Sequence, residues 1–382
     1  MFQEKNLADN IRKQRISKGI TQTELARILN VSPQSVSKWE RGTALPDIEN
    51  LCLLSNALGI SVDKLLGHEV TREKLLIGID GGGSKTEFVL FRNDGTLLDR
   101  CILGPCNPNA IGLDNCAALL SQGIDKLVAS PEELIGIYVG ASGFATGGNG
   151  KKIHAVLSKL YRNAQIRCET DIMNVIAAAE QEHKCIAVIC GTGSVVYAKE
   201  ADTMTKLTGW GYLLSTSGSG YDIGRDALRQ ALSEAEGLAE RSLITELVEA
   251  KLGASADHCV QEVYRHDPAY IASFTPLVFE AYAHGDLAAK KILTDNAHNL
   301  ASVINHAATR YDCGDHVVLS GGLLTDNHTF RNMVTEQLLP SLIVSIPKIP
   351  QVLAACHLCA QMCGIDAQDF MNKLALQYQE KR

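Results

Sequence analysis

The sequence lacks an apolar run long enough to cross a membrane. No segment approaches eighteen consecutive apolar residues, and the N-terminus has no hydrophobic stretch of the signal-peptide type. The 382 residues exceed what one ordinary core holds, and 46% apolar with 21% charged residues is a globular rather than a disordered composition. We therefore expect a cytoplasmic protein of two or three domains, with no membrane partner.

A cysteine framework is also missing. The twelve cysteines are scattered through apolar or mixed segments. One pair, Cys356 and Cys359, has a metal-like spacing, but a second such pair is lacking and the segment has the pattern of an apolar helix. We expect reduced, buried thiols rather than disulfides or a zinc site.

Positive charge is scarce outside the front of the chain. The formal net charge is −7, yet the first 41 residues carry eight Lys and Arg against four Asp and Glu. An acidic body is repelled by DNA, so any contact with nucleic acid has to be made by this basic front segment.

Residues 7–66 have the pattern of five short helices. Thr21 and Glu24 form a capping box, and Ser32 with Pro33 begins the next helix. The second and third helices are joined by three or four residues, which is the geometry that places a recognition helix in the major groove. The alternative is a five-helix protein-interaction module, which would not need reachable polar side chains on one exposed helix.

The motifs of this front segment are Thr21–Ala26, Val31–Gly42 and Leu45-Pro46. Together they resemble the Cro/C1 (Xre) helix-turn-helix family over residues 7–66. The resemblance implies a homodimer that binds DNA at a palindromic operator. It assigns DNA contacts to Gln22, Pro33, Gln34, Ser35 and Lys38, with Gln22 on a phosphate. A Gln amide suits adenine and Lys suits guanine, whereas Pro33 can only touch a methyl group.

Three glycine-rich signatures organise the rest of the chain. The first two, within Leu75–Phe91 and Ile186–Tyr197, are strand–glycine–strand patterns about 110 residues apart, and the third lies within His316–Leu323. A tight hairpin with exposed amides can clamp a phosphate without a bulky side chain. Two such hairpins in two halves predict a duplicated fold that closes over a nucleotide in the intervening cleft.

Other phosphate motifs are excluded by inspection. A P-loop requires Gly before its Lys, but Ser84 precedes Lys85, and Ile79 stands where the leading Gly belongs. No hairpin has Gly-x-Gly-x-x-Gly opening a helix, so a dinucleotide fold is unsupported.

The motifs of the body are Asp80–Thr86, Gly140–Gly143, Thr170-Asp171, Gly191–Ser194, Gly209–Gly211, Gly218–Arg225 and Ser320–Gly322. Their order is similar to that of the BadF/BadG family, which contains the N-acetylglucosamine kinases and has the actin, Hsp70 and sugar-kinase fold. The fold class implied is an all-α helix-turn-helix headpiece followed by a two-lobed α/β actin-like (ribonuclease H-like) ATPase.

The domain boundaries expected are 1–67 for the helix-turn-helix domain, 68–74 for a polar linker, 75–184 for the first lobe and 185–382 for the second. The C-terminal helix is expected to pack back on the first lobe.

The resemblance implies ATP and Mg²⁺ as cofactors and an amino sugar as the small-molecule ligand. The nucleotide-binding residues it implies are Asp80, Gly81, Gly82, Gly83, Ser84, Lys85, Thr86, Gly191, Thr192, Gly193, Ser320, Gly321 and Gly322. Asp80 would also place the metal, and Asn107, Ser142 and Thr216 would meet the sugar. Asp171 would be the general base, since a sugar kinase needs a carboxylate near the attacking hydroxyl. From its position alone, Asp171 fits the N-cap of a helix equally well.

One departure from the family concerns the sugar. The amino-sugar kinases carry Gly-Asp-Glu where this chain has Ser215, Thr216 and Ser217. Replacing a sugar-binding aspartate by Thr216 costs about 1.5–3 kcal/mol of binding. Three functions therefore stay open: a regulator that senses an amino sugar, a working amino-sugar kinase, and an activator of a radical dehydratase, for which Cys190 is the nearest candidate cluster ligand.

Overall fold

A computed structural model describes residues 4–67, 74–180, 184–201, 203–215, 217–366 and 368–380. The chain divides into two compact units, Met1–Lys74 and Leu75–Arg382. Within the described residues, no helix is long and apolar enough to span a membrane.

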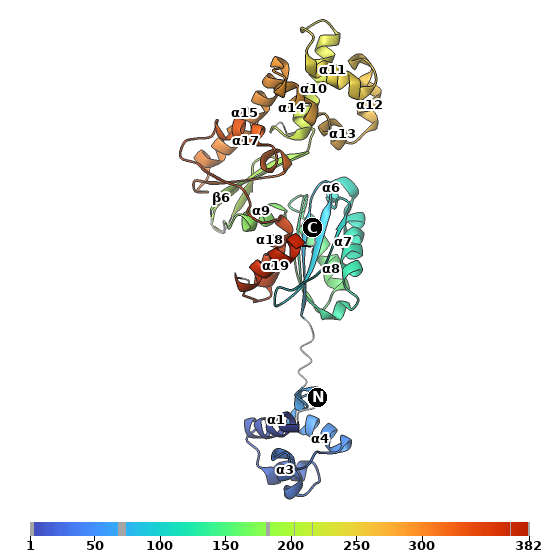
Figure 1. The fold of residues 1–382 in the computed structure, drawn as a ribbon, viewed down its shortest axis with the longest axis vertical. Helices are drawn as coiled ribbons and strands as arrows, with labels where there is room; N and C mark the ends of the chain where they lie inside the picture. The colour runs from blue at the N-terminus through green and yellow to red at the C-terminus, as the bar shows by residue number, and fades with distance from the viewer. Residues whose placement is uncertain are drawn as a thin grey trace. The chain divides into compact units, whose positions relative to one another are not determined.

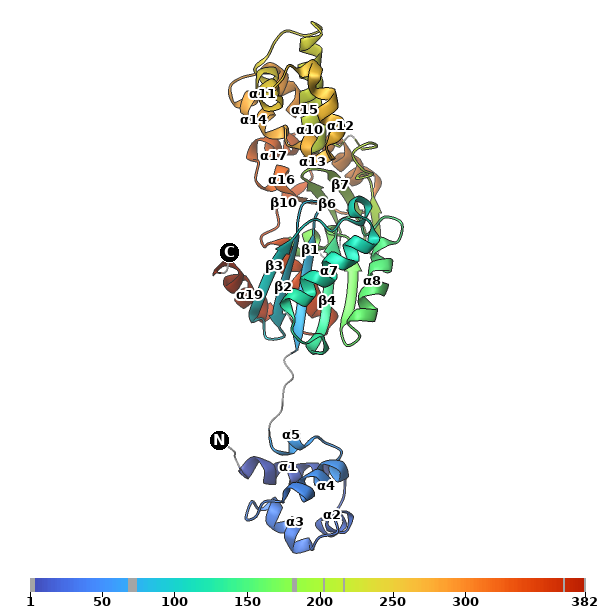
Figure 2. The same ribbon diagram turned by 90° about the vertical axis from the view of Figure 1, so that its right-hand side faces the viewer.

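The first unit is a bundle of short helices, drawn in blue in Figures 1 and 2. The helices are α1 (Glu4–Ser17), α2 (Gln22–Ile28), α3 (Pro33–Glu40), α4 (Ile48–Leu58) and α5 (Val62–Leu65). The capping box expected at the start of α2 is present, because the Thr21 hydroxyl accepts from the Glu24 amide and the Glu24 carboxylate accepts from the Thr21 amide. Ser32 caps α3, and Pro33 occupies its first turn.

A buried carboxylate joins three of these helices. Glu40 is 7% exposed and accepts hydrogen bonds from Arg15 Nε at 2.6 Å and from Gln22 Nε2 at 2.7 Å. Burial alone would raise the pKa of Glu40, but the bonds from Arg15 and Gln22 outweigh it and hold that pKa below its usual range. α1, α2 and α3 therefore meet at one ion pair.

The second unit begins with a five-stranded sheet in the order β3-β2-β1-β4-β5. The strands are β1 (Leu75–Gly81), β2 (Thr86–Arg92), β3 (Leu97–Leu103), β4 (Leu134–Ala141) and β5 (Gln165–Glu169). The first three run antiparallel, and β4 and β5 are parallel to β1. The connecting helices are α6 (Pro108–Ile111), α7 (Leu113–Leu127), η1 (Pro131–Glu133) and α8 (Asn149–Leu160).

The second sheet repeats this plan. Its order is β10-β9-β6-β7-β8. Read from the other end, with β6 counted as its first strand, this is the third-second-first-fourth-fifth order of the first sheet. The strands are β6 (Cys185–Cys190), β7 (Ser194–Lys199), β8 (Met204–Lys206), β9 (His316–Ser320) and β10 (Ile343–Ser345). A helical headpiece followed by a duplicated α/β body is therefore confirmed.

Helices cover both faces of each sheet. α7 and α8 pack on one face of the first sheet, and α18 (Gln351–Met362) and α19 (Gln368–Glu380) pack on the other, as Figure 1 shows. On the second sheet, α9 (Ile172–Ala178) covers one face, and α10 (Gly220–Ala235), α14 (Thr275–Ala283) and α15 (Leu287–Arg310) cover the opposite face. The remaining helices are α11 (Leu243–Leu252), η2 (Ala256–His258), α12 (Cys259–Arg265), α13 (Pro268–Ala272), α16 (Gly322–Thr325) and α17 (His328–Thr335).

The chain returns at its end to the first sheet. α18 packs against β1 and also against α9, so these two helices lie between the sheets. Tyr378 of α19 donates a hydrogen bond to Glu87 of β2 at 2.5 Å. The first half of the body is thus completed by residues from the C-terminal end of the sequence.

The Glu40 contact predicts a stability effect in the first unit. Glu40→Ala leaves Arg15 without its buried partner and should lower the free energy of unfolding of this unit by about 3 kcal/mol. Calorimetry of the full chain measures the unfolding transition of the unit. Glu49→Ala, at an exposed site on α4, is the matched control and should cost less than about 1 kcal/mol. Equal effects of the two variants would contradict a bridging role for Glu40.

Candidate functional site

Asp80 lies near the end of β1, where its strand neighbour in β4 is Gly140. The carboxylate is half-buried and accepts a hydrogen bond from Asn174 Nδ2 at 2.7 Å. Burial raises the pKa of Asp80 to about 7, the Asn174 bond opposes this rise, and the nearby negative charge of Asp171 adds to it. Two carboxylates from different elements therefore lie close together.

Asp171 stands between β5 and α9, and it accepts a hydrogen bond from the Thr170 hydroxyl at 3.0 Å. It occupies the N-cap position of α9, but among the described residues its side chain makes no capping hydrogen bond. Burial raises the pKa of Asp171 to about 6, against the lowering effect of the Thr170 bond. The Thr170 hydroxyl thus holds the side chain, and the charge of Asp171 acts on Asp80.

Lys206 is a residue that the sequence analysis did not identify. In the second sheet it is the strand neighbour of Tyr197, whose side chain packs on α9. Burial lowers the pKa of Lys206, while the charge of Asp171 opposes that shift. Its Nζ lies 4.7 Å from the centre of the Trp210 ring. A lone lysine shortly before the Gly209–Gly211 motif was the signal available in the sequence.

The first glycine hairpin joins β1 to β2 and is closed by a hydrogen bond from the Gly82 amide to the Lys85 carbonyl at 2.8 Å. Gly81 has to be glycine, because a Cβ there would lie 2.3 Å from Cys106 Sγ. Gly83 and Ser84 are exposed, and their amides donate no hydrogen bond within the described part of the chain.

Thr86 begins the strand that leaves this hairpin. Its side chain is buried, and its hydroxyl donates to the carbonyl of Gly104 at 2.8 Å. Thr86 therefore holds the hairpin in place through its side chain, and the exposed members of the predicted set are Gly83, Ser84 and Lys85.

The second hairpin joins β6 to β7 through Gly191, Thr192 and Gly193. The Gly191 and Thr192 carbonyls accept hydrogen bonds from the Gly220 and Tyr221 amides, at 2.8 and 2.9 Å, at the start of α10. Thr192 and Gly193 are exposed, and in the described part of the chain their own amides donate no hydrogen bond. Within the described residues, each hairpin thus presents two amides that donate no hydrogen bond, as a phosphate clamp requires.

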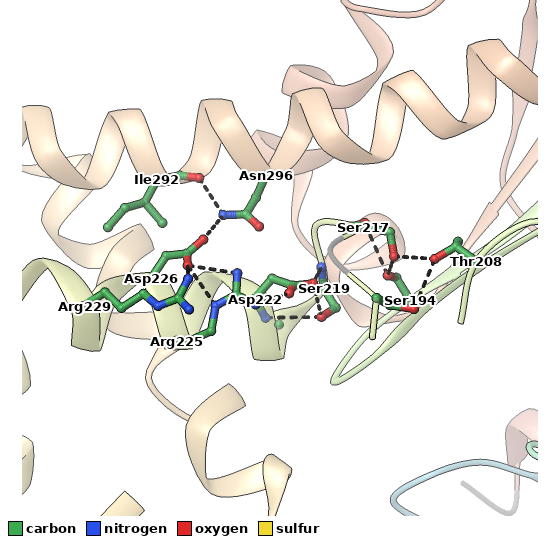
Figure 3. Close-up of polar contacts among 12 residues, drawn as sticks. Ser194, Thr208, Ser217, Ser219, Asp222, Arg225, Asp226, Arg229, Ile292 and Asn296 are labelled. Atoms are coloured by element: carbon green, nitrogen blue, oxygen red, sulfur yellow. Dashed lines mark hydrogen bonds and ion pairs between the residues drawn. The ribbon is translucent and has the colours of Figure 1, made fainter. Parts of the chain in front are cut away.

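The start of α10 is fixed by a buried capping box, shown in Figure 3. Ser219 donates to Asp222 through its amide at 3.0 Å and its hydroxyl at 2.7 Å. Arg225 pairs with Asp222 at 2.9 Å on the next turn. The first turn of α10, which contacts the second hairpin, is therefore held by several hydrogen bonds, and Arg225 balances the charge of Asp222.

In the segment that departs from the family pattern, the hydroxyls of Ser215 and Ser217 form hydrogen bonds within the protein. Ser217 is 2% exposed and its hydroxyl bonds to those of Ser194 at 2.5 Å and Thr208 at 2.9 Å, as Figure 3 shows. The Ser215 hydroxyl accepts from the Trp210 amide at 2.8 Å. The predicted sugar contact Thr216 lies outside the described residues.

The other two residues predicted to meet a sugar come together. Asn107 Nδ2 donates to Ser142 Oγ at 3.3 Å, and the Ser142 amide donates to the Gly81 carbonyl at 2.8 Å. Gly143 leaves room for Asn107, because a Cβ on Gly143 would lie 2.2 Å from Asn107 Oδ1. This pair is therefore anchored one residue from Asp80.

In the third glycine motif, Ser320 and Gly321 are packed against other parts of the protein, and Gly322 is exposed. The Ser320 side chain is fully buried and bonds to Gln351 Nε2 at 2.5 Å. Gly321 has a φ of +88°, and a Cβ there would lie 2.3 Å from the Cys190 carbonyl. Gly322 is exposed at the start of α16. Ser320 thus ties the end of β9 to α18, and Gly321 lies against the end of β6.

In the first unit, the predicted DNA contacts lie mainly on one helix. Pro33, Gln34 and Lys38 of α3 are exposed, while the Ser35 hydroxyl is paired with that of Ser32 at 2.9 Å. Gln22 is half-buried and its amide nitrogen is already bonded to Glu40. Gln34 and Lys38 are therefore the most accessible polar groups of the set.

A transition-metal site receives no support. In the described residues, no group of three or more His, Cys, Asp or Glu side chains could hold a metal ion. Cys356 and Cys359 are buried, and burial raises the pKa of both thiols.

Comparison with known proteins identifies both units. Residues 77–356 match the BadF/BadG/BcrA/BcrD ATPase family, and residues 11–65 match a helix-turn-helix family. An N-acetylmuramic acid/N-acetylglucosamine kinase of Clostridium acetobutylicum is 31% identical over 235 residues, covering 59% of this chain and 77% of that protein. The SPbeta prophage-derived uncharacterized HTH-type transcriptional regulator YonR of Bacillus subtilis is 43% identical over 58 residues, or 15% of this chain and 54% of that protein.

The fold of the body also has solved counterparts. A putative N-acetylglucosamine kinase from Chromobacterium violaceum superimposes with a TM-score of 0.62 at 22% identity, covering 75% of this chain and 99% of that chain. This likeness confirms the predicted two-lobed, actin-like (ribonuclease H-like) fold class, and the family matches confirm both resemblances drawn from the sequence.

Because the pKa of Asp171 is raised, replacing this residue by asparagine should stabilise the protein by an amount that depends on pH. The folded-state pKa of about 6 exceeds the ordinary value near 3.9, so this carboxyl contributes stability at low pH that is lost as pH rises through 6. Asp171→Asn should therefore raise the free energy of unfolding by about 1–2 kcal/mol at pH 7.5, discounted because the group is partly exposed. The gain should shrink toward pH 4 in urea-unfolding experiments.

Asp94→Asn is the control with the opposite sign. Hydrogen bonds from Thr96 lower the pKa of Asp94 to about 2, so its contribution is present at neutral pH and disappears on acidification. Asp94→Asn should thus destabilise at pH 7.5. An Asp171→Asn protein no more stable than wild type at pH 7.5 would show that Asp171 is well solvated.

Proposed function

Because the chain belongs to the BadF/BadG/BcrA/BcrD ATPase family and carries a helix-turn-helix domain in front of it, we propose that it is a DNA-binding transcriptional regulator. Its body binds ATP with Mg²⁺, and an amino sugar acts as the effector. The observation that carries the nucleotide part of this proposal is the position of Asp80, whose carboxylate is held by Asn174 next to a hairpin with two amides that donate no hydrogen bond in the described residues.

The residues present fit a metal-bound nucleotide. In the described residues the amides of Gly83, Ser84, Thr192 and Gly193 donate no other hydrogen bond, so they are open to phosphate oxygens. Asp80 supplies a hard oxygen ligand of the kind that Mg²⁺ prefers. Mg²⁺, when bound, would neutralise charge on the phosphates. Gly322 is the exposed residue of the third motif and is proposed to border the adenosine.

The amino sugar is proposed to lie against Asn107 and Ser142. Both side chains are neutral, and their mutual bond at 3.3 Å is weak enough to exchange for bonds to a ligand. Asp171 would accept a bond from a sugar hydroxyl. Relatives named as N-acetylmuramic acid/N-acetylglucosamine kinase and N-acetyl-D-glucosamine kinase support this class of ligand.

A working N-acetylhexosamine kinase is the second candidate. The observation in its favour is Asp171, which makes no capping bond among the described residues and whose pKa is raised to about 6. A base with a pKa near the working pH accepts a proton efficiently from an attacking hydroxyl.

The dehydratase-activator alternative receives no support from Cys190. This thiol is fully buried at the end of β6, and burial raises its pKa well above the ordinary range. A cluster ligand has to be a thiolate, so this thiol is poorly suited to that role.

DNA recognition is assigned to α3 of a homodimer on a palindromic operator. Gln34 and Lys38 are proposed to reach base edges, and Pro33 to touch a methyl group. Ser35 and Gln22 are proposed to contact the phosphate backbone, Gln22 with the amide hydrogen that is not bonded to Glu40. Two-fold symmetric binding places two copies of α3 one helical turn of DNA apart.

Lys38→Ala should weaken binding to an operator selected from random-sequence DNA by the wild-type protein. The expected loss is about tenfold to a hundredfold, because one good base contact is worth about 1–3 kcal/mol. Fluorescence anisotropy across a salt series measures both affinity and its steep salt dependence. Lys64→Ala, at an exposed lysine of α5, is the control and should change affinity less than threefold by comparison. Wild-type binding that is undetectable or indifferent to salt would remove the regulator proposal.

A screen of amino sugars separates sensor from kinase. Each sugar is tested with ATP in a coupled assay for ADP release and, in parallel, for a shift in melting temperature. A sensor should show stabilisation without turnover, whereas a kinase shows both. Where turnover occurs, Asp171→Asn should abolish it and leave stabilisation by Mg²⁺ and ATP intact, because the variant lacks only the base. Unchanged turnover would remove Asp171 from that role.

A further inference from the structure

Asn174 is a polar residue buried at a position on α9 where an apolar side chain would pack at lower cost. It lies on α9 and is fully buried, with the buried neighbours Ile172, Val175 and Ile176 on the same short helix. Polar groups buried in such surroundings are costly unless their hydrogen bonds are satisfied.

Only part of this amide is satisfied. Asn174 Nδ2 donates to Asp80 Oδ1 at 2.7 Å and to the Gly140 carbonyl at 3.3 Å. Both partners are acceptors, which fixes the orientation of the amide. Its Oδ1 is buried without a partner in the described part of the chain. An unpaired buried acceptor costs about 1–3 kcal/mol, which an apolar residue would avoid.

The surrounding backbone makes room for this contact. A Cβ on Gly140 would lie 2.3 Å from Asn174 Oδ1, so glycine is required opposite the amide. The Asn174 amide N–H also donates to the Asp171 carbonyl at 3.0 Å, within the first turn of α9. One turn of helix therefore carries the candidate base and the group that holds Asp80.

We infer that Asn174 is a positioning residue that fixes the Asp80 carboxylate for Mg²⁺-bound nucleotide, an inference that rests on the proposed function. The hydrogen bond ties down Oδ1, and Oδ2 has no hydrogen-bond partner among the described residues. A carboxylate held by one oxygen presents the other in a fixed direction, so metal binding does not have to order the side chain. Asn174 itself touches neither metal nor nucleotide in this arrangement.

Asn296 supplies a matched control, shown in Figure 3. It is 1% exposed on α15, and its Nδ2 donates to Asp226 Oδ2 at 3.0 Å and to the Ile292 carbonyl at 2.9 Å. Its Oδ1 is likewise buried and unpartnered within the described residues. Asp226 is paired with Arg225 at 2.9 Å and belongs to no proposed ligand contact.

The test is a Mg²⁺ titration at fixed ATP, read as the rise in melting temperature of the full chain. Asn174→Ala should need about tenfold more Mg²⁺ than wild type for half-maximal stabilisation, because one charge-assisted bond no longer orients Asp80. Asn296→Ala should lower the melting temperature without ligand to a similar degree, yet keep the Mg²⁺ requirement within about twofold of wild type.

The possible results separate the inference from the proposed function. A Mg²⁺ requirement that is the same for Asn174→Ala, Asn296→Ala and wild type overturns the positioning role and leaves nucleotide binding standing. Wild type that ATP and Mg²⁺ do not stabilise overturns both. If Asn174→Ala does not fold, Asn174→Ser replaces it: a serine hydroxyl is too short to hold Asp80, so the same increase is expected and its absence counts against the role.

Discussion

The burial of two carboxylates beside each other is the constraint on which the site depends. Asp80 and Asp171 repel each other, and burial raises the pKa of each to about 7 and about 6. Such a pair persists only where donors and positive charge compensate it. Asn174 donates to Asp80, Thr170 donates to Asp171, and Lys206 supplies positive charge from the second sheet. A bound Mg²⁺ ion would supply further positive charge to balance these two carboxylates.

Duplication explains why this constraint can be met. Both sheets share one strand order, and the hairpin between the first two strands of each carries exposed amides. Asp171 follows β5 of the first sheet, and Lys206 on the second sheet is close enough for the two charges to interact. A ligand bound between the two hairpins would therefore contact elements of both halves.

The sequence was most informative where local chemistry determines structure. The Thr21–Glu24 capping box, the glycine hairpins and the strand ending in Asp80 follow from short-range rules, and the structure shows them as expected. Asn174 and Lys206 were missed because their roles arise from contacts between distant segments, with no motif of their own. Likewise, Thr86 and Ser320 were predicted from the sequence to contact the nucleotide, but tertiary packing uses their hydroxyls internally.

A structure of the full chain with Mg²⁺ and a non-hydrolysable ATP analogue tests the central claim most directly. Mg²⁺ should lie about 2.1 Å from, or one water away from, an Asp80 carboxylate oxygen. Phosphate oxygens should lie within hydrogen-bond distance of the Gly83, Ser84, Thr192 or Gly193 amides. A nucleotide bound away from both hairpins, or Asp80 with no metal or metal-bound water beside it, would contradict that claim.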